Sequence, residues 1–539
     1  MVDSSQNPIA SEPKLLWTVV VISVTATFFL GIVPERTWVF SDTAHYMSTA
    51  RMIMEGKGIQ TDLIYYGEQT RAGTIPAPQT VFPPGYSIVV AAGSKLTGAN
   101  HHELARWLCL TAYAFVAPLI FLLGIEIRLP QHTAAICAVI WITIAETWMS
   151  TWCYSSDIPF LVLTLSSMLF FIRSNDRTAG LLMAGILAAV AISWRYAGIF
   201  LGIAYGVALL FQHRGRLLPT IRSGMFAIAP AVLMTLLLFA RNQSLAGTWR
   251  GGNNYVGQPV DLVLKTAYYC LCSLTGFSLK GLVALEFTCV TQVVIGTMVL
   301  GAAMALLFRD KTRLFREALS SRAAVALVYT PITIAMLIYL HATKSSGMST
   351  RLFIPIIPTA LLALGLLYEQ YAARSRRVRI IASAVGLVGI AVVVMGQPEC
   401  LAGNRALAAR GVATRIILDQ PVAAGSSTTL GQYLRAHCDQ QHALLSSMPQ
   451  MTHLFVEQPS IGLPTSYFNT LNEPWTSKRV QDVVIRPYSV RYVLLLTHPD
   501  TSNHGSEFFK DLQAGDRPEW LTVVFQQDDF TLFTVNDAP

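Results

Sequence analysis

The sequence has few charged residues, which make up 13% of its 539 positions. Soluble domains carry about 25% charged residues, so a chain with half that density needs long apolar segments that water does not reach. A hydrophobic fraction of 53% and a mean hydropathy of +0.47 agree with this. The composition therefore excludes a set of soluble domains and predicts an integral membrane protein. It also argues against nucleic acid as a partner, although the isoelectric point is near 9.0.

Several motifs of soluble enzymes are absent. The eight cysteines form no Cys-x-x-Cys pair and have no histidines at metal-ligand spacing, so they indicate neither a zinc site nor a redox motif. The C-terminal region contains no glycine-rich phosphate loop and no nucleophile motif. Cys400 and Cys438 lie in that region, and from the sequence both a disulfide and two free thiols remain open.

Eleven apolar segments predict eleven membrane spans, although several are shorter than the roughly 20 residues of an upright helix. They are residues 15–33, 105–125, 132–149, 158–172, 179–194, 196–211, 222–240, 285–308, 323–341, 352–369 and 379–396. No small-residue cleavage site follows the first segment, which is therefore expected to be retained as a span. With eleven spans, the short arginine-rich connections at 128, 173–177, 214–222, 309–322 and 374–379 all face one side. The positive-inside rule makes that side cytoplasmic.

This topology divides the chain into three parts. Residues 1–14 form a cytoplasmic N-terminal tail, and residues 15–396 form a multi-span membrane domain with a large extracytoplasmic loop at 34–104. Residues 397–539 have no apolar run long enough to span, so they predict a soluble extracytoplasmic α/β domain. The strands expected there are 442–447, 491–497 and a hairpin of 520–525 with 530–535, and the expected helices are 428–437 and 477–485. Within the loop, residues 85–97 predict an interfacial helix, with a short span as the alternative.

Two carboxylates are candidates for catalysis. Asp42 lies in a short amphipathic segment after the first span, where it is either a helix N-cap or a general base at the membrane surface. Asp157 directly precedes a span with Pro159 in its first turn, a position that the helix dipole alone can explain. Both face the same compartment in the eleven-span topology. Two carboxylates at one interface favour catalysis over capping alone.

Four basic residues are predicted on the extracytoplasmic face, against the positive-inside pattern: Arg195, Arg241, Lys344 and Arg351. Each one alone can be explained by a side chain that reaches lipid headgroups. Together they predict a site for an anionic lipid phosphate, to which arginine side chains bind with two parallel hydrogen bonds.

Other polar and aromatic side chains are predicted near the same interface. Glu146 lies near the outer end of a span, where a carboxylate is costly unless it is paired or hydrated. His45 and Tyr46 follow Asp42, and Tyr86 follows a Pro-Pro pair that sets an extended entry to a helix. We expect these four residues to line the acceptor side of the site.

The motifs and their order resemble the GT-C-type membrane glycosyltransferases, in particular the prokaryotic group that includes protein O-mannosyltransferases and lipid A aminoarabinose transferases. The resemblance covers roughly residues 15–396. It rests on Asp42-x-x-x-Tyr46 with Gly56-x-Gly58, Phe82-Pro83-Pro84-Gly85-Tyr86, Ala105-Arg106, Asp157, Trp194-Arg195-Tyr196, Arg241-Asn242 with Gly247, and Arg351-x-x-x-Pro355-x-x-Pro358. The expected fold is therefore an all-α, GT-C-like polytopic membrane protein of about eleven transmembrane helices, with a small C-terminal extracytoplasmic α/β domain.

The resemblance implies transfer of a sugar from a polyprenyl-phosphate carrier to a lipid, glycan or protein acceptor at the outer face of the cytoplasmic (inner) membrane. Asp42 then corresponds to the acidic residue that activates the acceptor, and Asp157 to the second acidic position. Arg351, with Arg195, Arg241 or Lys344, neutralises the phosphate leaving group. No cofactor is required, and a divalent metal, if one is used, is expected between Asp42 and Asp157.

Two features depart from the family pattern. Thr43 follows Asp42 where the O-mannosyltransferases have an Asp-Glu pair, and Phe82 precedes Pro-Pro where many relatives have a basic residue. Acceptor identity and metal dependence therefore do not carry over.

The alternative function is a polytopic lipid or sugar transporter, or flippase. Such proteins place ionisable groups near the bilayer midplane, usually between repeated halves. This sequence has no clear internal repeat, and its unusual charges are predicted at one interface, which favours one-sided chemistry. The expected partners are the polyprenyl-phosphate sugar donor and membrane lipids.

Overall fold

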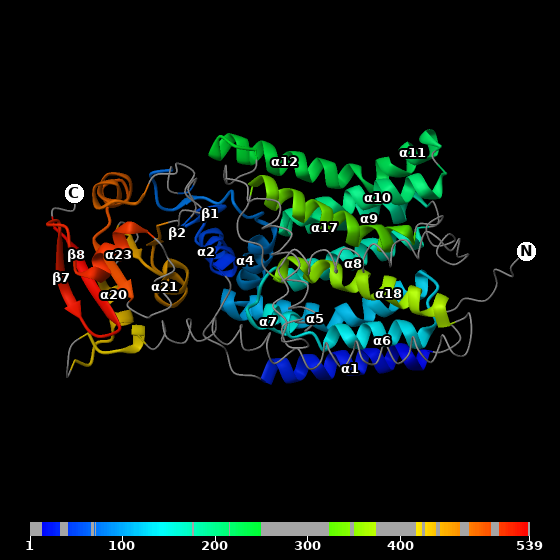
Figure 1. The fold of residues 1–539 in the computed structure, drawn as a ribbon, viewed down its shortest axis with the longest axis horizontal. Helices are drawn as coiled ribbons and strands as arrows, with labels where there is room; N and C mark the ends of the chain where they lie inside the picture. Colours follow the sequence, from blue (N-terminus) through cyan, green and yellow to red (C-terminus); the bar gives the residue numbers. More distant parts are fainter. Residues whose placement is uncertain are drawn as a thin grey trace, which may run out of the picture.

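The computed structural model contains a bundle of long helices beside a smaller α/β unit (Figure 1). It describes residues 13–32, 41–65, 69, 72–174, 177–214, 216–249, 323–344, 350–372, 417–422, 426–437, 442–463, 474–496 and 506–536. The bundle consists of α1 (Pro13–Ile32), α5 (His101–Glu126), α6 (Gln131–Ile142), α7 (Ala145–Trp152), α8 (Asp157–Arg173), α9 (Thr178–Trp194), η1 (Tyr196–Gly198), α10 (Ile199–Gln212), α11 (Leu217–Ala227), α12 (Ala229–Ala246), α17 (Ala324–Lys344), η2 (Thr350–Ile356) and α18 (Ile357–Ala372).

Every predicted span within the described residues coincides with a helix or a helix pair. Of these, the helical segments Lys14–Ile32, His101–Glu126 and Arg351–Glu369 are long and apolar enough to cross a membrane by themselves. Two bent pairs, α6 with α7 (58°) and α11 with α12 (57°), raise the number to five if each pair counts as one span. Predicted spans 285–308 and 379–396 lie outside the described residues, so the total of eleven stays a prediction.

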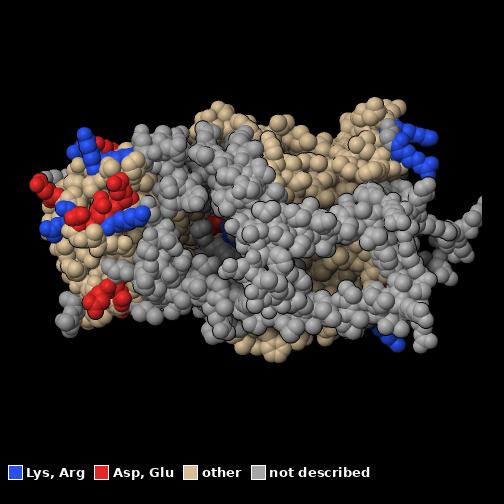
Figure 2. All heavy atoms as spheres, in the orientation of Figure 1, with Lys and Arg blue, Asp and Glu red and all other residues tan. Residues whose placement is uncertain are grey.

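The outer helices expose large apolar side chains to their surroundings. Trp17, Phe28 and Phe29 of α1 are each 64% exposed, and α12 similarly exposes Leu233 and Leu236 at 59%. Contiguous exposed apolar surface of this kind is stable only against lipid or another apolar partner. Figure 2 shows Lys and Arg side chains at the far end of the bundle and charges of both signs on the α/β unit. The protein is therefore a membrane protein with a polar unit at one end of its apolar body.

The first loop lies between the bundle and the α/β unit (Figure 1). It contains α2 (Ser41–Met54), the antiparallel pair β1 (Gln60–Thr61) and β3 (Ala77–Pro78), the short strand β2 (Leu63–Ile64) and α4 (Gly85–Thr97). A Cβ atom at Gly85 would lie 2.3 Å from Ser193 Oγ and 2.6 Å from Ser193 O, so only glycine allows α4 to approach α9 this closely. Residues 85–97 form a helix of 13 residues, too short to span the bilayer upright.

The α/β unit is built on a six-stranded sheet in the order β2-β5-β4-β6-β8-β7. The pairs β2–β5, β5–β4 and β4–β6 are parallel, and β6–β8 and β8–β7 are antiparallel. The elements after the bundle are α20 (Leu430–His437), β4 (Leu444–Ser446), α21 (Pro449–Val456), β5 (Ser460–Ile461), α22 (Ser477–Val480), the π-helical turn η3 (Gln481–Ile485), β6 (Tyr492–Leu496), α23 (Glu507–Ala514), β7 (Leu521–Gln526) and β8 (Phe530–Val535). Strands occur at all four segments where the sequence predicts them.

One strand of this sheet comes from the first loop. Leu63 and Ile64 of β2 align with Ser460 and Ile461 of β5, and the Gly462 N–H donates to the Ile64 carbonyl at 2.8 Å. The sequence did not predict this strand, because two residues are too few to show an alternating pattern. The sheet thus joins the loop to the C-terminal region across the predicted boundary at residue 397.

A substitution of Ile64 tests whether β2 joins the first loop to the α/β unit. Its side chain is fully buried in the apolar core of the α/β unit. We expect Ile64→Ala to lower the free energy of unfolding by about 2–5 kcal/mol, since truncation removes buried methyl groups and leaves a cavity. Thermal unfolding of the purified protein in detergent measures the effect. Ile88→Ala is the matched control, because Ile88 of α4 is 42% exposed and its truncation leaves no cavity. If both variants lower the stability equally, then β2 does not anchor the first loop in the α/β unit.

Candidate active site

Asp42 lies in the first turn of α2, the loop helix between the bundle and the α/β unit (Figure 1). Its carboxylate accepts a hydrogen bond from the Arg351 guanidinium in an ion pair. Arg351 belongs to η2, which directly precedes α18 in the chain and packs against α7 and α8. The two side chains are 8% and 14% exposed. Residues 309 positions apart in sequence thus form one buried, charge-assisted pair.

A second pair of the same kind joins Asp157 and Arg195. Arg195 Nη1 lies 2.8 Å from Asp157 Oδ1 and donates to Ser156 Oγ at 3.1 Å. The other carboxylate oxygen, Oδ2, accepts from Ser155 Oγ at 2.9 Å. Arg195 has extended backbone between α9 and η1, which turns its side chain out of the helical register. The start of α8 and the break after α9 therefore position the pair.

The two pairs belong to one cluster. Burial alone would raise the pKa of Asp42, but the positive charges of Arg351 and Arg195 lower it below its usual value. Tyr46, one helical turn after Asp42, donates from its hydroxyl to the Trp194 carbonyl at 3.2 Å. Burial raises the pKa of Tyr46 to about 12, so it remains a neutral hydrogen-bonding group. Two carboxylates and two guanidiniums thus meet at the bundle end with balanced charge.

Aromatic rings cover one side of this cluster. The Tyr46 ring lies 5.2 Å from the Tyr86 ring in a T-shaped arrangement and 5.4 Å from the Phe82 ring. Tyr86 is fully buried and donates to the Tyr154 carbonyl at 2.7 Å. The His45 ring lies 5.5 Å from Phe82. The structure therefore brings His45, Tyr46 and Tyr86 together and adds Phe82, which the sequence analysis named within a family motif but not as a site residue.

The remaining predicted residues lie in different surroundings. Arg241 donates to the carbonyls of Gln79 at 2.8 Å and Ile59 at 3.3 Å, so its hydrogen bonds hold the backbone of the first loop. Glu146 is buried in the first turn of α7, the helix that packs against η2. Lys344 is the last residue of α17, and its side chain lies outside the described part of the chain.

Ser155 and Ser156 support the cluster and were not singled out from the sequence. They fix Asp157 and Arg195 through their hydroxyls. Their only signal in the sequence is their position next to Asp157, which equally fits an ordinary helix start.

The donor set of the cluster suits an organic phosphate. Each carboxylate is already paired with an arginine, so a metal between Asp42 and Asp157 would have to share the space with two guanidinium cations. Guanidinium groups bind phosphate oxygens through parallel hydrogen bonds, and an ionised carboxylate can accept a proton. Among the described residues, three close metal-ligating side chains occur elsewhere, at His101, His102 and Glu457.

We expect His45 to make the stability of the protein depend on pH. Burial lowers its pKa from 6.5 to about 3, although the Asp42 charge opposes the shift. The unfolded chain therefore binds a proton near pH 6.5 that the folded protein does not bind, and stability is lost as the pH falls from 6.5 toward 3. We expect the Tm in detergent to fall between about pH 7 and about pH 5, and to fall less in His45→Gln. Identical slopes for the two proteins would exclude His45 as a source of the dependence.

No protein-family model and no curated protein sequence matches this chain. Solved structures of membrane glycosyltransferases do match its fold. ArnT from Cupriavidus metallidurans, bound to undecaprenyl phosphate, aligns over 96% of this chain and 97% of its own, with 12% identity and a TM-score of 0.52. The oligosaccharyltransferase from Archaeoglobus fulgidus, tethered to an acceptor peptide, aligns over 89% of this chain and 69% of its own, with 12% identity and a TM-score of 0.50. The GT-C-type fold predicted from the motifs is confirmed.

Proposed function

Starting from this GT-C-type fold, we propose that the protein is a glycosyltransferase that moves a sugar from a polyprenyl-phosphate carrier to an acceptor of the cell envelope. The observation that carries the proposal is the buried cluster of Asp42 with Arg351 and Asp157 with Arg195. The cluster combines a carboxylate base with two phosphate-binding cations in one place, which are the two functions that this transfer needs.

The donor phosphate would bind by replacing Asp42 as the partner of the Arg351 guanidinium. Its negative charge competes with Asp42 for the Arg351 guanidinium, and Arg195 is close enough to Asp42 to contribute as well. Binding would thus release the Asp42 carboxylate from its ion pair while the guanidinium remains neutralised. Asp157 keeps Arg195 in place through the 2.8 Å contact. In this scheme Arg351 and Arg195 bind phosphate, whereas Arg241 positions the first loop and Lys344 remains a candidate only by its place at the end of α17.

The transfer step follows from this arrangement. Asp42 accepts the proton of the acceptor hydroxyl, whose oxygen attacks the anomeric carbon of the sugar. The new oxygen–carbon bond forms as the bond from that carbon to the phosphate oxygen breaks, with inversion. The electron pair of the broken bond stays on the phosphate, whose growing negative charge the two arginines stabilise. Before the donor binds, the lowered pKa of Asp42 keeps its carboxylate ionised at neutral pH, so that it is ready to accept a proton.

The distribution of charged side chains also supports an orientation of the protein in the membrane. Lys and Arg side chains gather at the bundle end opposite the α/β unit (Figure 2), the charge pattern that the positive-inside rule expects of the cytoplasmic side. We therefore place the cluster, the first loop and the C-terminal domain of residues 397–539 on the extracytoplasmic side of the inner membrane.

Binding of the bare carrier tests the proposal without knowledge of the sugar. We expect undecaprenyl phosphate to raise the Tm of the purified protein, and undecaprenol, which lacks the phosphate, to raise it less. Arg351→Gln should abolish the difference. Arg173→Gln is the matched control, since Arg173 is also paired with a carboxylate, Glu126, but at the opposite end of α8. A response that is the same for both lipids, or unchanged in Arg351→Gln, would contradict the phosphate site.

Transfer itself is tested in membranes that contain the protein and an endogenous acceptor pool. Labelled polyprenyl-phosphate sugars should be consumed, with release of the polyprenyl phosphate. If no sugar of a broad panel is consumed and the carrier instead changes leaflet, the transporter alternative replaces the enzyme.

A further inference from the structure

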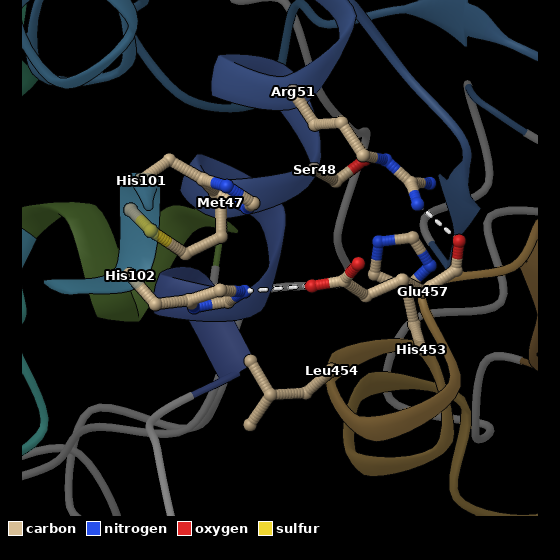
Figure 3. Close-up of a pocket in the computed structure, with 8 residues that line it drawn as sticks. All are labelled: Met47, Ser48, Arg51, His101, His102, His453, Leu454 and Glu457. Carbon is tan, nitrogen blue, oxygen red and sulfur yellow. Dashed lines mark hydrogen bonds and ion pairs between the residues drawn. The ribbon is translucent and has the colours of Figure 1, made fainter. Parts of the chain in front are cut away.

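A separate cluster of metal-ligating side chains lies where the bundle meets the C-terminal α/β unit. His101 and His102 begin α5, and Glu457 follows α21 directly. Figure 3 shows these side chains around a small cavity that Met47 and Arg51 of α2 also line. The cavity volume is about 10 Å³, close to the space that a single water molecule occupies. It suits a single ion or water and is too small for a sugar or a lipid headgroup.

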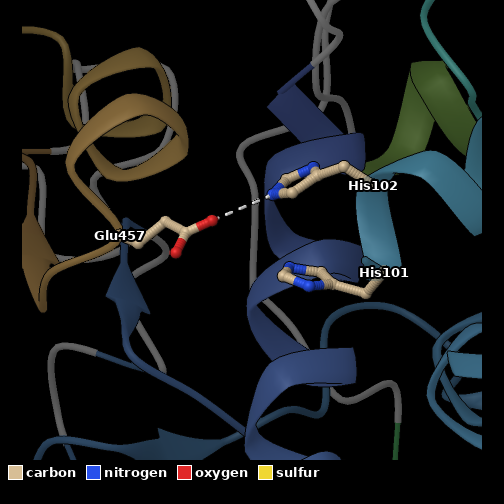
Figure 4. Close-up of side chains that lie close together, drawn as sticks. All are labelled: His101, His102 and Glu457. Carbon is tan, nitrogen blue, oxygen red and sulfur yellow. Dashed lines mark ion pairs between the residues drawn. The ribbon is translucent and has the colours of Figure 1, made fainter. Parts of the chain in front are cut away.

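The three side chains point toward one another (Figure 4). Their ligand atoms all lie within 4.8 Å of one another, and His102 Nε2 is 3.6 Å from the Glu457 carboxylate. In a tetrahedral zinc site the ligand atoms lie roughly 3.3 Å apart, so small side-chain rotations would complete the geometry. His101 is 7% exposed, whereas half of the Glu457 side chain is exposed, which leaves a route for an ion to enter.

The surroundings hold two of the ligands in position. His102 Nδ1 lies 3.3 Å from the Tyr154 hydroxyl, the kind of outer contact that orients a ligating imidazole and leaves its other nitrogen for a metal. Glu457 has a φ of 58°, a left-handed conformation that is unfavourable for glutamate, and its carbonyl accepts a hydrogen bond from Arg51. The backbone thus directs the Glu457 carboxylate toward the histidines.

The other charged groups around the cavity are already occupied. Arg51 is ion-paired with Asp62, which also accepts from Ser48 Oγ at 2.6 Å. His453 Nε2 faces the same carboxylate at 3.4 Å, and its Nδ1 lies 2.8 Å from the Gln458 carbonyl. The positive end of the α5 dipole opposes a cation, but the Glu457 carboxylate and Glu103 in the first turn of α5 offset it.

We propose that His101, His102 and Glu457 bind one divalent transition-metal ion, with water as the fourth ligand. Two imidazoles and a carboxylate are a common ligand set for Zn²⁺. The ion would connect the start of α5 in the membrane domain to the end of α21 in the α/β unit, and so fix the position of that unit over the first loop. This role is independent of the proposed transfer activity and of the Asp42 cluster.

Metal content and thermal stability of the full-length protein, prepared without a histidine tag, test the proposal. After treatment with EDTA and equilibration with buffered Zn²⁺, the wild type should retain one Zn²⁺ per chain and gain several degrees in Tm. Glu457→Gln, which preserves the size of a partly exposed side chain, should lose both effects, as should His102→Ala. Co²⁺ in place of Zn²⁺ should give the visible absorption of a tetrahedral complex in the wild type and lose it in Glu457→Gln.

His132→Ala provides the matched control. His132 Nε2 and Glu369 Oε1 are also 3.6 Å apart, but this pair is not part of a group of three ligating side chains among the described residues. The variant should bind Zn²⁺ like the wild type. If the wild type and Glu457→Gln retain equal Zn²⁺, or if Zn²⁺ raises the Tm of both equally, the proposal is wrong, whatever the outcome of the carrier and transfer experiments.

Discussion

Asp42→Asn should reduce sugar transfer by about 10²–10⁴-fold, the range that general-base catalysis contributes. Asparagine has nearly the same shape as aspartate, but its amide cannot accept a proton. Donor binding should persist, because the variant removes the carboxylate charge that competes with phosphate for the Arg351 guanidinium. The rate of labelled-sugar consumption and the Tm shift with undecaprenyl phosphate measure the two effects separately.

Asp62→Asn is the control for this prediction. Asp62 is also a buried aspartate that is ion-paired with an arginine, but it lies between α2 and the α/β unit, outside the Asp42 cluster. We expect Asp62→Asn to lower the Tm and to retain transfer below that Tm. If Asp42→Asn and Asp62→Asn lose transfer to the same extent at equal protein level, Asp42 has no special chemical role.

Arg195→Gln should lower the free energy of unfolding by about 3–5 kcal/mol, because it leaves the Asp157 carboxylate buried without its counter-charge. Asp157 is fully buried, and Arg195 is its ion-pair partner. The double variant Arg195→Gln with Asp157→Asn removes both charges and should recover much of the stability. Transfer should stay low in both, since neither retains Arg195, one of the two cations that bind the phosphate in this scheme. Thermal unfolding in detergent, in parallel with the transfer assay, separates the two effects.

Arg173→Gln is the control, because it removes one partner of a more exposed ion pair. Arg173 and Glu126 are 39% and 23% exposed, and pairs that water reaches typically contribute about 0–1 kcal/mol. We expect only a small change in stability. If the double variant is no more stable than Arg195→Gln, the buried charge of Asp157 is not the reason for the loss.

The metal proposal and the active-site proposal concern different faces of the same loop helix. The α2 helix carries Asp42 in its first turn and Met47 and Arg51 further along, beside the cavity of His101 and His102. A metal that fixes α21 beside α2 would therefore act on stability, through residues that are not part of the Asp42 cluster. Loss of Zn²⁺ and loss of Asp42 are distinguishable, because only the former should change the metal content.

The sequence alone determined the properties that depend on local composition and period. Low charge, long apolar runs and the distribution of arginines were sufficient to predict a membrane protein and the positions of the described helices of the bundle, since each span must satisfy its own backbone hydrogen bonds. The short apolar runs at 442–447 and 491–497 and the hairpin pattern of 520–525 with 530–535 likewise located strands of the α/β unit. The ordered motifs led to the GT-C-type fold.

Only the tertiary structure decided which charges meet. Asp42 and Arg351 are far apart in the sequence, and nothing local distinguishes Arg351 from Arg241, which instead holds loop carbonyls. The same holds for β2, which is too short to have a pattern and becomes a strand because β5 offers it backbone partners. His101, His102 and Glu457 have no metal-ligand spacing and form a group only where two parts of the chain pack together. Such pairings depend on contacts between distant segments, so no local pattern in the sequence encodes them.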